Sequence, residues 1–251
     1  MTLAGTEPRD EVRPELGAEL RDELRASTSY FAHVACHLQK DLRLEWRSRE
    51  AVVGMLFFAL LTVIIFSLAF DPTAAVSRQI AGGILWVALL FASFTALNQS
   101  WTREQRNRVL EAQRMSPAAP SALFLGKALA NFLFVSLVEL VLAFFFIIFY
   151  NLHTLGQGWM MLIVLPLGTW ALVSNGTFFA AMGLRTRNRE LMLPLIMVPI
   201  SLPALLAMMQ ATTAILTGEF DPAHWIRLLV GYDVAFTVVC LLLFDTILSA
   251  E

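Results

Sequence analysis

Charged residues are scarce in this chain of 251 amino acids. Asp, Glu, Lys and Arg make up 15% of it, against roughly 25% in an ordinary soluble domain. Hydrophobic residues make up 57%, and the mean hydropathy is +0.66. This composition excludes an ordinary soluble globular protein and predicts an integral membrane protein. Because one helical crossing needs about 20 apolar residues, there is room for about six spans but not for a separate nucleotide-binding domain as well.

Cysteine and the common catalytic motifs are also lacking. The two cysteines, Cys36 and Cys240, lie far apart and outside any CxxC pair, so neither a disulfide framework nor a structural zinc motif follows. HExxH, GxSxG and the phosphate-binding GxxxxGK[ST] are absent. We therefore expect no covalent chemistry, no metal site and no directly bound cofactor. The net charge of -2 gives no electrostatic basis for nucleic-acid binding.

Charge is concentrated before the first apolar run. Residues 1–29 hold seven acidic residues and four arginines, which predicts a mobile tail that can become helical from Glu15 onward. Residues 30–50 predict an amphipathic elbow helix lying in the membrane interface. Its apolar stripe is Phe31, Val34, Ala35, Leu38, Leu42 and Trp46; its opposite, cationic side is Lys40, Arg43 and Arg47; Leu44 and Glu45 fit neither. A soluble helix packed on a partner is the alternative.

Residues 51–251 read as one domain with six membrane spans. The apolar segments lie near 51–70, 80–98, 125–150, 159–182, 191–216 and 226–248. The Gly82-Gly83 pair in the second segment predicts close helix packing rather than a nucleotide loop. The predicted fold class is therefore all-α integral membrane.

The basic residues predict the orientation of the chain. Sixteen of the 18 Lys and Arg lie before the first span, between spans two and three, or between spans four and five. Arg78 and Arg227 alone lie on the other side. The positive-inside rule then places both termini in the cytoplasm. The first 29 residues also lack the apolar run of a signal peptide, which agrees with a cytoplasmic amino terminus.

The longest connection on the basic side, residues 101–116, consists mostly of good helix formers and ends before Pro117. We interpret it as an exposed coupling helix that docks into a groove of a soluble partner. Its candidate contact residues are Arg103, Glu104, Arg106, Arg108, Leu110 and Glu111. The alternative is a solvated loop held near anionic lipid.

Polar residues inside the spans are energetically costly and are therefore candidates for function. Glu139, Asn175 and Asp233 are the strongest of them, and a structural role between helices competes with a role in transport. His153 and His224 follow spans three and five on the outer side. Each is a weak candidate for an axial haem ligand, although loop histidines are usually only solvated.

Several segments together resemble the cytochrome c maturation haem exporter protein B family. They are KDLRLEWRSRE at 40–50, GILWVALLFASFTALNQSW at 83–101, SPAAPSALFLGKALANFLFVSLVELVL at 116–142, NGTFFAAMGLRTRNRELMLPLIMVPISLPALLA at 175–207 and LLLFDTILSAE at 241–251. The resemblance covers roughly residues 36–251 and leaves the acidic tail outside.

The resemblance implies an ABC-2/type V-like permease subunit in the bacterial inner membrane. Such a subunit pairs with a cytoplasmic ABC ATPase, which binds the ATP, and with other cytochrome c maturation membrane subunits. Haem is then a possible substrate, or ATP hydrolysis drives release of a haem-loaded chaperone. Three alternatives stay open: an ABC-2-like permease for a lipid, drug or polysaccharide, a non-transporting membrane scaffold, and an intramembrane enzyme using Glu139 and Asp233.

Overall fold

The computed structural model describes residues 12–69, 74–106, 119–150, 157–183 and 189–249. Within these residues every regular element is a helix and none is a strand. The helices are α1 (Val12–Ser48), α2 (Glu50–Ala69), α3 (Ala74–Arg106), α5 (Pro120–Tyr150), the short 3₁₀ helix η1 (Gly158–Met160), α6 (Met161–Gly183), α7 (Arg189–Thr217) and α8 (Ala223–Ser249).

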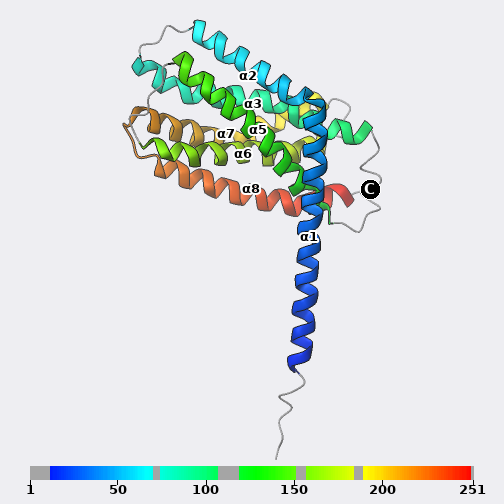
Figure 1. Ribbon diagram of the computed structural model, residues 1–251. Helices are drawn as coiled ribbons and strands as arrows, with labels where there is room; N and C mark the ends of the chain where they lie inside the picture. Colours follow the sequence, from blue (N-terminus) through cyan, green and yellow to red (C-terminus); the bar gives the residue numbers. More distant parts are fainter. Residues whose placement is uncertain (1–11, 70–73, 107–118, 151–156, 184–188, 250–251) are drawn as a thin grey trace, which may run out of the picture.

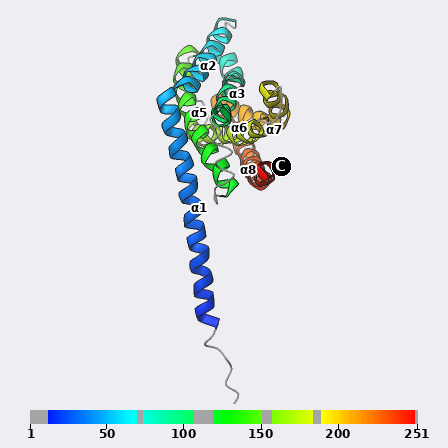
Figure 2. The same ribbon diagram turned by 90° about the vertical axis from the view of Figure 1, so that its right-hand side faces the viewer.

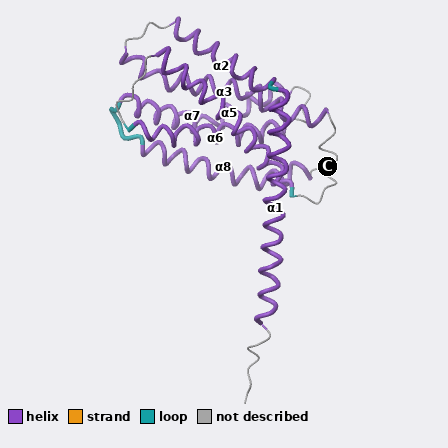
Figure 3. Tube along the Cα trace, in the orientation of Figure 1, coloured by secondary structure: helices purple, strands orange, loops and turns teal. Residues whose placement is uncertain are grey.

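Helices α2 to α8 lie side by side in one bundle, and α1 crosses one end of that bundle and projects beyond it (Figure 1; Figure 2). The described loop between α7 and α8, residues 218–222, lies at the end of the bundle away from α1 (Figure 3). Helix α8 ends at the same end of the bundle that α1 crosses (Figure 1). Below, this is called the α1 end.

Six helices of the bundle are long and apolar enough to cross a membrane, as predicted. The second begins earlier than expected, at Ala74, whereas the third begins at Pro120, next to Ser121, where the sequence had left an interfacial start open. Helix α3 also continues past the apolar run to Arg106. The prediction of a separate helix over 101–116 is therefore wrong at its start, because residues 101–106 complete α3. Residues 107–116 lie outside the described part of the chain.

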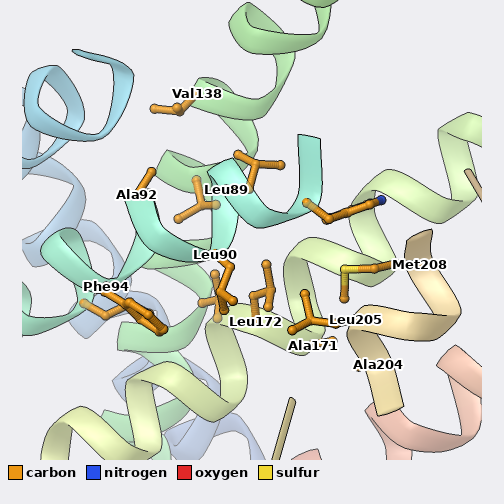
Figure 4. Packing of buried hydrophobic residues seen from close by; sticks show 14 of the residues in the cluster. Leu89, Leu90, Ala92, Phe94, Val138, Ala171, Leu172, Ala204, Leu205 and Met208 are labelled. Atoms are coloured by element: carbon orange, nitrogen blue, oxygen red, sulfur yellow. The ribbon is translucent and has the colours of Figure 1, made fainter. Parts of the chain in front are cut away.

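The core of the bundle is formed around α3 and α6. In their most apolar stretches 72% and 61% of residues are buried, against 22% in α2 and α8. Figure 4 shows apolar side chains of α3 and α6 meeting those of α7, including Leu89, Leu172 and Leu205. The large side chains left exposed on α2, α5 and α8 would be an aggregation hazard in water, and in a bilayer they face lipid.

Glycines let the central helices approach one another. A Cβ on Gly168 of α6 would lie 2.2 Å from the indole ring of Trp86 on α3. A Cβ on Gly82 would lie 3.1 Å from the carbonyl oxygen of Met209, so the packing role predicted for Gly82 is confirmed. For Gly83 that prediction is wrong, since nothing lies within 4 Å of an added Cβ.

Helix α1 is longer than the expected elbow helix. It begins at Val12, and residue 30 is not a helix boundary. Pro14 fits in its first turn because the first backbone N–H groups of a helix have no intrahelical acceptor. The helix ends at Ser48, and the next residue, Arg49, has a φ of 54° that turns the chain into α2. A sharp corner thus joins the elbow to the first span.

Candidate functional site

Helix α1 lies directly against the first turns of α5. A Cβ on Gly126 would lie 2.7 Å from Cβ of His37 and 2.9 Å from the carbonyl oxygen of Val34. Both distances are shorter than real Cβ contacts, so only glycine permits this approach. The close contact brings the polar face of α1 against the ends of the spans.

Lys127 is the centre of the resulting cluster. It follows Gly126 on α5, and its side chain is 1% exposed. Its Nζ lies 3.1 Å from Oδ2 of Asp41 on α1 and 3.2 Å from Oε1 of Glu104 on α3. It also donates to Oγ of Ser100 at 3.2 Å and lies 4.9 Å from the ring centroid of Trp101. Two carboxylates and an aromatic face thus compensate the buried ammonium.

Lys40 forms a second link between α1 and α3. Its ammonium donates to Oε1 of Glu104 and lies 3.2 Å from Oδ1 of Asp41. Burial alone would lower the pKa of Lys40, but the carboxylates of Glu104 and Asp41 outweigh burial, and its pKa is raised. The pKa of neighbouring His37 is lowered, first by burial and then by the positive charge of Lys40.

Glu45 holds the corner between α1 and α2. Its Oε2 accepts a hydrogen bond from Nη1 of Arg103 at 2.7 Å. Its Oε1 accepts the backbone N–H of Ala51 at 3.1 Å, which satisfies a free donor in the first turn of α2. Nη2 of Arg103 lies 3.9 Å from the exposed carboxylate of Glu50. Charged side chains therefore connect α1, α2, α3 and α5 at this end of the bundle.

We call this cluster the ionic junction. It consists of Lys40, Asp41, Glu45, Arg103, Glu104 and Lys127. It contains three cations and three anions, so its net charge is zero when all are ionised. A cavity of about 80 Å³ lies beside it, between α1, α2, α3 and α5.

The structure corrects several sequence predictions at this site. Glu104 was expected to be an exposed docking residue, but it is buried, and Arg103 is half-buried beside it. Lys40 was expected on the outer cationic face of the elbow and instead faces the bundle. Both errors have one cause: α1 packs against α5, and its charged side chains thereby reach the end of α3, which is far from them in the sequence.

Other predictions for the elbow helix hold in part. Arg43 and Arg47 are exposed, as expected of its cationic side. Val34 of the apolar stripe is buried against the bundle. Phe31 and Trp46, at the two ends of the stripe, point away from the bundle and are 66% and 70% exposed. These two aromatic side chains are free to enter lipid.

The remaining candidates for the coupling contact cannot be placed. Arg106 is the last residue of α3, and nothing is described of its side chain. Arg108, Leu110 and Glu111 lie outside the described residues. Their role in docking stays a prediction.

The polar residues within the spans do not form one site. Oε2 of Glu139 accepts a hydrogen bond from Oγ1 of Thr169 at 2.5 Å. Nδ2 of Asn175 donates to the hydroxyl of Tyr232 at 2.7 Å, which donates to the carbonyl oxygen of Ile200. Neither carboxylate oxygen of Asp233 has a hydrogen-bond partner among the described residues. Asn175 thus ties α6 to α8 and α7, while the two carboxylates remain separate features.

Of the two histidines proposed as weak haem ligands, the described residues include His224 and not His153. His224 lies in the first turn of α8, is exposed, and has its ring 5.5 Å from that of Trp225. His153 lies outside the part of the chain that the structure describes. The geometry therefore adds no support for ligation by either residue.

Sequence reasoning missed Lys127 and Asp41. One signal was present in the sequence: lysine is rare, with Lys40 and Lys127 the two in the chain. The structure places both in the ionic junction. Lys127 also stands inside an otherwise apolar segment, where a cation needs a partner. The poor fit of Glu45 to the amphipathic stripe was a second signal.

The fold and the junction together define a multi-pass helical membrane protein with six spans and an elbow helix held by buried ion pairs. The family model described as CcmB protein matches residues 32–248. The chain belongs to this family. The match begins within α1 and includes every span of the described bundle.

Curated relatives extend over most of the chain. The heme exporter protein B of Bradyrhizobium diazoefficiens is 26% identical over 206 residues, which are 82% of this chain and 87% of that protein. That of Rhodobacter capsulatus is 30% identical over 170 residues, 67% of this chain and 77% of that protein. That of Pseudomonas aeruginosa is 26% identical over 202 residues, 80% of this chain and 90% of that protein.

Proposed function

We propose that the chain is the permease subunit of an ABC-type haem exporter that acts in cytochrome c biogenesis. In this role it couples ATP hydrolysis on a partner ATPase to haem transport or to release of a haem-loaded chaperone. The family match and the name heme exporter protein B of the relatives support this proposal. The ionic junction is the structural observation that carries the coupling step.

The junction stands where a movement of the ATPase would enter the membrane domain. Glu104 and Arg103 lie in the last turn of α3, directly before the connection 107–118. A partner that docks on this connection pushes or pulls the end of α3. Because Glu104 is paired with Lys40 and Lys127, α1 and α5 move with it. Coupling then requires that the nucleotide states favour different arrangements of these helices.

The proposed orientation follows from the charges. The α1 end faces the cytoplasm, because sixteen of the 18 Lys and Arg belong to the segments assigned to that side. The ATPase then binds at the α1 end, both chain termini are cytoplasmic, and the membrane is the bacterial inner membrane. Other cytochrome c maturation membrane subunits contact the lipid-facing helices.

The first test is co-expression with the candidate ATPase, purification through a tag on this chain, and assays of ATP hydrolysis and bound haem. A stable complex that hydrolyses ATP and contains haem supports the proposal. An active complex without haem dependence favours a permease for a lipid, drug or polysaccharide. Absence of the ATPase from the folded, purified protein contradicts the coupling role and favours a scaffold.

A second test addresses the junction itself. Arg103→Gln removes the hydrogen bond to Glu45 and should reduce the stimulation of ATP hydrolysis by this chain more than it reduces co-purification. Arg43→Gln, on the exposed side of α1, is the matched control and should change neither. Equal stimulation by both variants would contradict transmission through the junction.

A further inference from the structure

Helices α5 and α6 meet through polar side chains at two levels. Nearer the α1 end, Nδ2 of Asn131 on α5 donates to Oγ1 of Thr177 on α6 at 3.1 Å. Farther from that end, Oγ1 of Thr169 on α6 donates to Oε2 of Glu139 on α5 at 2.5 Å. The two levels are about two helical turns apart on both helices, so they belong to one antiparallel contact with a fixed register.

Glu139 is a buried acid without a compensating charge. It is 3% exposed. At about 1.5 Å per residue it lies about 16 Å from the end of α5 at Tyr150, roughly half the thickness of a hydrocarbon core. Among the described residues its Oε1 has no hydrogen-bond partner, and no cation forms an ion pair with its carboxyl group. The hydroxyl of Thr169 alone does not compensate a full charge at this depth, so the neutral acid is favoured.

One apolar layer separates this acid from a polar cavity at the α1 end. Asn131 lines the cavity beside the ionic junction, which has room for water. Leu44 of α1 also lines that cavity and is half-exposed, so the cavity lies close to the surface. The register of α5 and α6 places Val135 opposite Val173, between the level of Asn131 and the level of Glu139. Both valines are buried in the apolar core, so water meets a closed layer there.

We propose that Glu139 is a proton-binding site that exchanges its proton with water at the α1 end through the layer of Val135 and Val173. While the layer is packed, the acid keeps its proton. When the two valines separate, water from the cavity reaches Glu139. The O–H bond then breaks, the proton passes to water as hydronium, and the carboxylate stays hydrated. Because the ionised form cannot be buried without a partner, a proton must return before the layer closes.

Proton binding at Glu139 therefore stabilises the packed contact of α5 with α6. Asp233, the other buried acid of the spans, also lacks hydrogen-bond partners among the described residues, but it does not lie on this contact. The proposed exchange needs water and the two helices and depends neither on haem nor on the ATPase.

Infrared spectroscopy of the full chain tests both the proton and its route. The protein is placed in nanodiscs of ether-linked phosphatidylcholine, which has no ester carbonyl. A neutral carboxylic acid has a C=O stretching band that a carboxylate lacks. At about pH 8, where an exposed glutamate is ionised, we expect this band in the parent protein and its loss in Glu139→Gln. Asp233→Asn identifies the band of the second buried acid.

Transfer to D₂O then measures the exchange, because replacing the proton by deuterium shifts the band. Val135→Ala should make the exchange about tenfold faster, since loss of buried methyl groups makes local opening easier. Val238→Ala is the same change at a position of α8 that is 49% exposed, and it should leave the rate unchanged.

Two results would overturn the proposal. If the parent and folded Glu139→Gln show the same acid band, Glu139 holds no proton. If Val135→Ala and Val238→Ala exchange at the same rate, the proton does not pass between the valines. Should Glu139→Gln fail to fold, Thr169→Val replaces it: loss of the hydroxyl should shift the Glu139 band, and an unshifted band contradicts the assignment. No ATPase or haem enters the assay, so its failure is independent of the proposed transport function.

Discussion

Replacing Lys127 with methionine tests whether the ionic junction holds α1 on the bundle. Methionine keeps the length of the side chain and its contact with Trp101 but removes the ammonium. Asp41 and Glu104 then share Lys40 as their remaining cationic partner in the junction. We expect the bundle to stay helical and α1 to detach more readily.

The structure sets the size of the effect. Removing one partner from a buried ion pair destabilises a protein by about 3–5 kcal/mol. Since Lys40 still compensates both carboxylates, the lower end, about 3 kcal/mol, is expected for Lys127→Met. Adding Asp41→Asn removes one of the two carboxylates that share Lys40 in the single variant. The double variant should therefore recover at least about 1 kcal/mol relative to the single variant.

The assay is equilibrium unfolding in mixed micelles titrated with a denaturing detergent, followed by circular dichroism and tryptophan fluorescence. Arg47→Gln, on the exposed side of α1, is the control and should change the free energy of unfolding by less than about 0.5 kcal/mol. The reasoning is refuted if Lys127→Met unfolds like the parent. It is also refuted if the single effects of Lys127→Met and Asp41→Asn add, because additivity means no coupling between the two residues.

Three further predictions concern the packing of α1 and the polar contact between α6 and α8. Gly126→Val should destabilise the protein by about 1–3 kcal/mol, measured by the same unfolding titration, because its Cβ would overlap α1. The lowered pKa of His37 means that the unfolded state binds more protons, so stability should fall as pH drops below about 6.5; a titration at several pH values should show this loss, and His37→Gln should remove it. Tyr232→Phe should cost about 1–3 kcal/mol of unfolding free energy by leaving Asn175 without its acceptor, whereas Val234→Ala, on the exposed side of α8, should leave that hydrogen bond intact.

The spans could be predicted from sequence because the bilayer fixes their length. Each needs a run of about 20 apolar residues, and all six runs became helices of that kind. The elbow could be predicted because apolar and basic residues alternate with helical period before the first run. These are local patterns, and local patterns are sufficient where the solvent imposes the constraint.

The ionic junction could not be predicted because its contacts are distant in sequence. Lys40 and Glu104 are 64 residues apart, and Lys127 and Asp41 are 86 apart. A charged residue close to the end of an apolar run is expected to be exposed to water. Glu104 was therefore interpreted as a docking residue. Its burial depends on how α1 crosses the bundle, and the sharp turn at Arg49 decides that path.

The location of the charges in the bundle supports the proposed coupling role of the ionic junction. Deeper in the bundle, helices α3, α6, α7 and α8 are tied by neutral contacts, such as Trp86 to Thr212 and Asn175 to Tyr232. Ion pairs join α1, α3 and α5 at the α1 end, where the desolvation penalty is smallest. Each lysine there contacts both Asp41 and Glu104. Since either cation can keep a carboxylate paired while the other shifts, this end can adjust without breaking the apolar core.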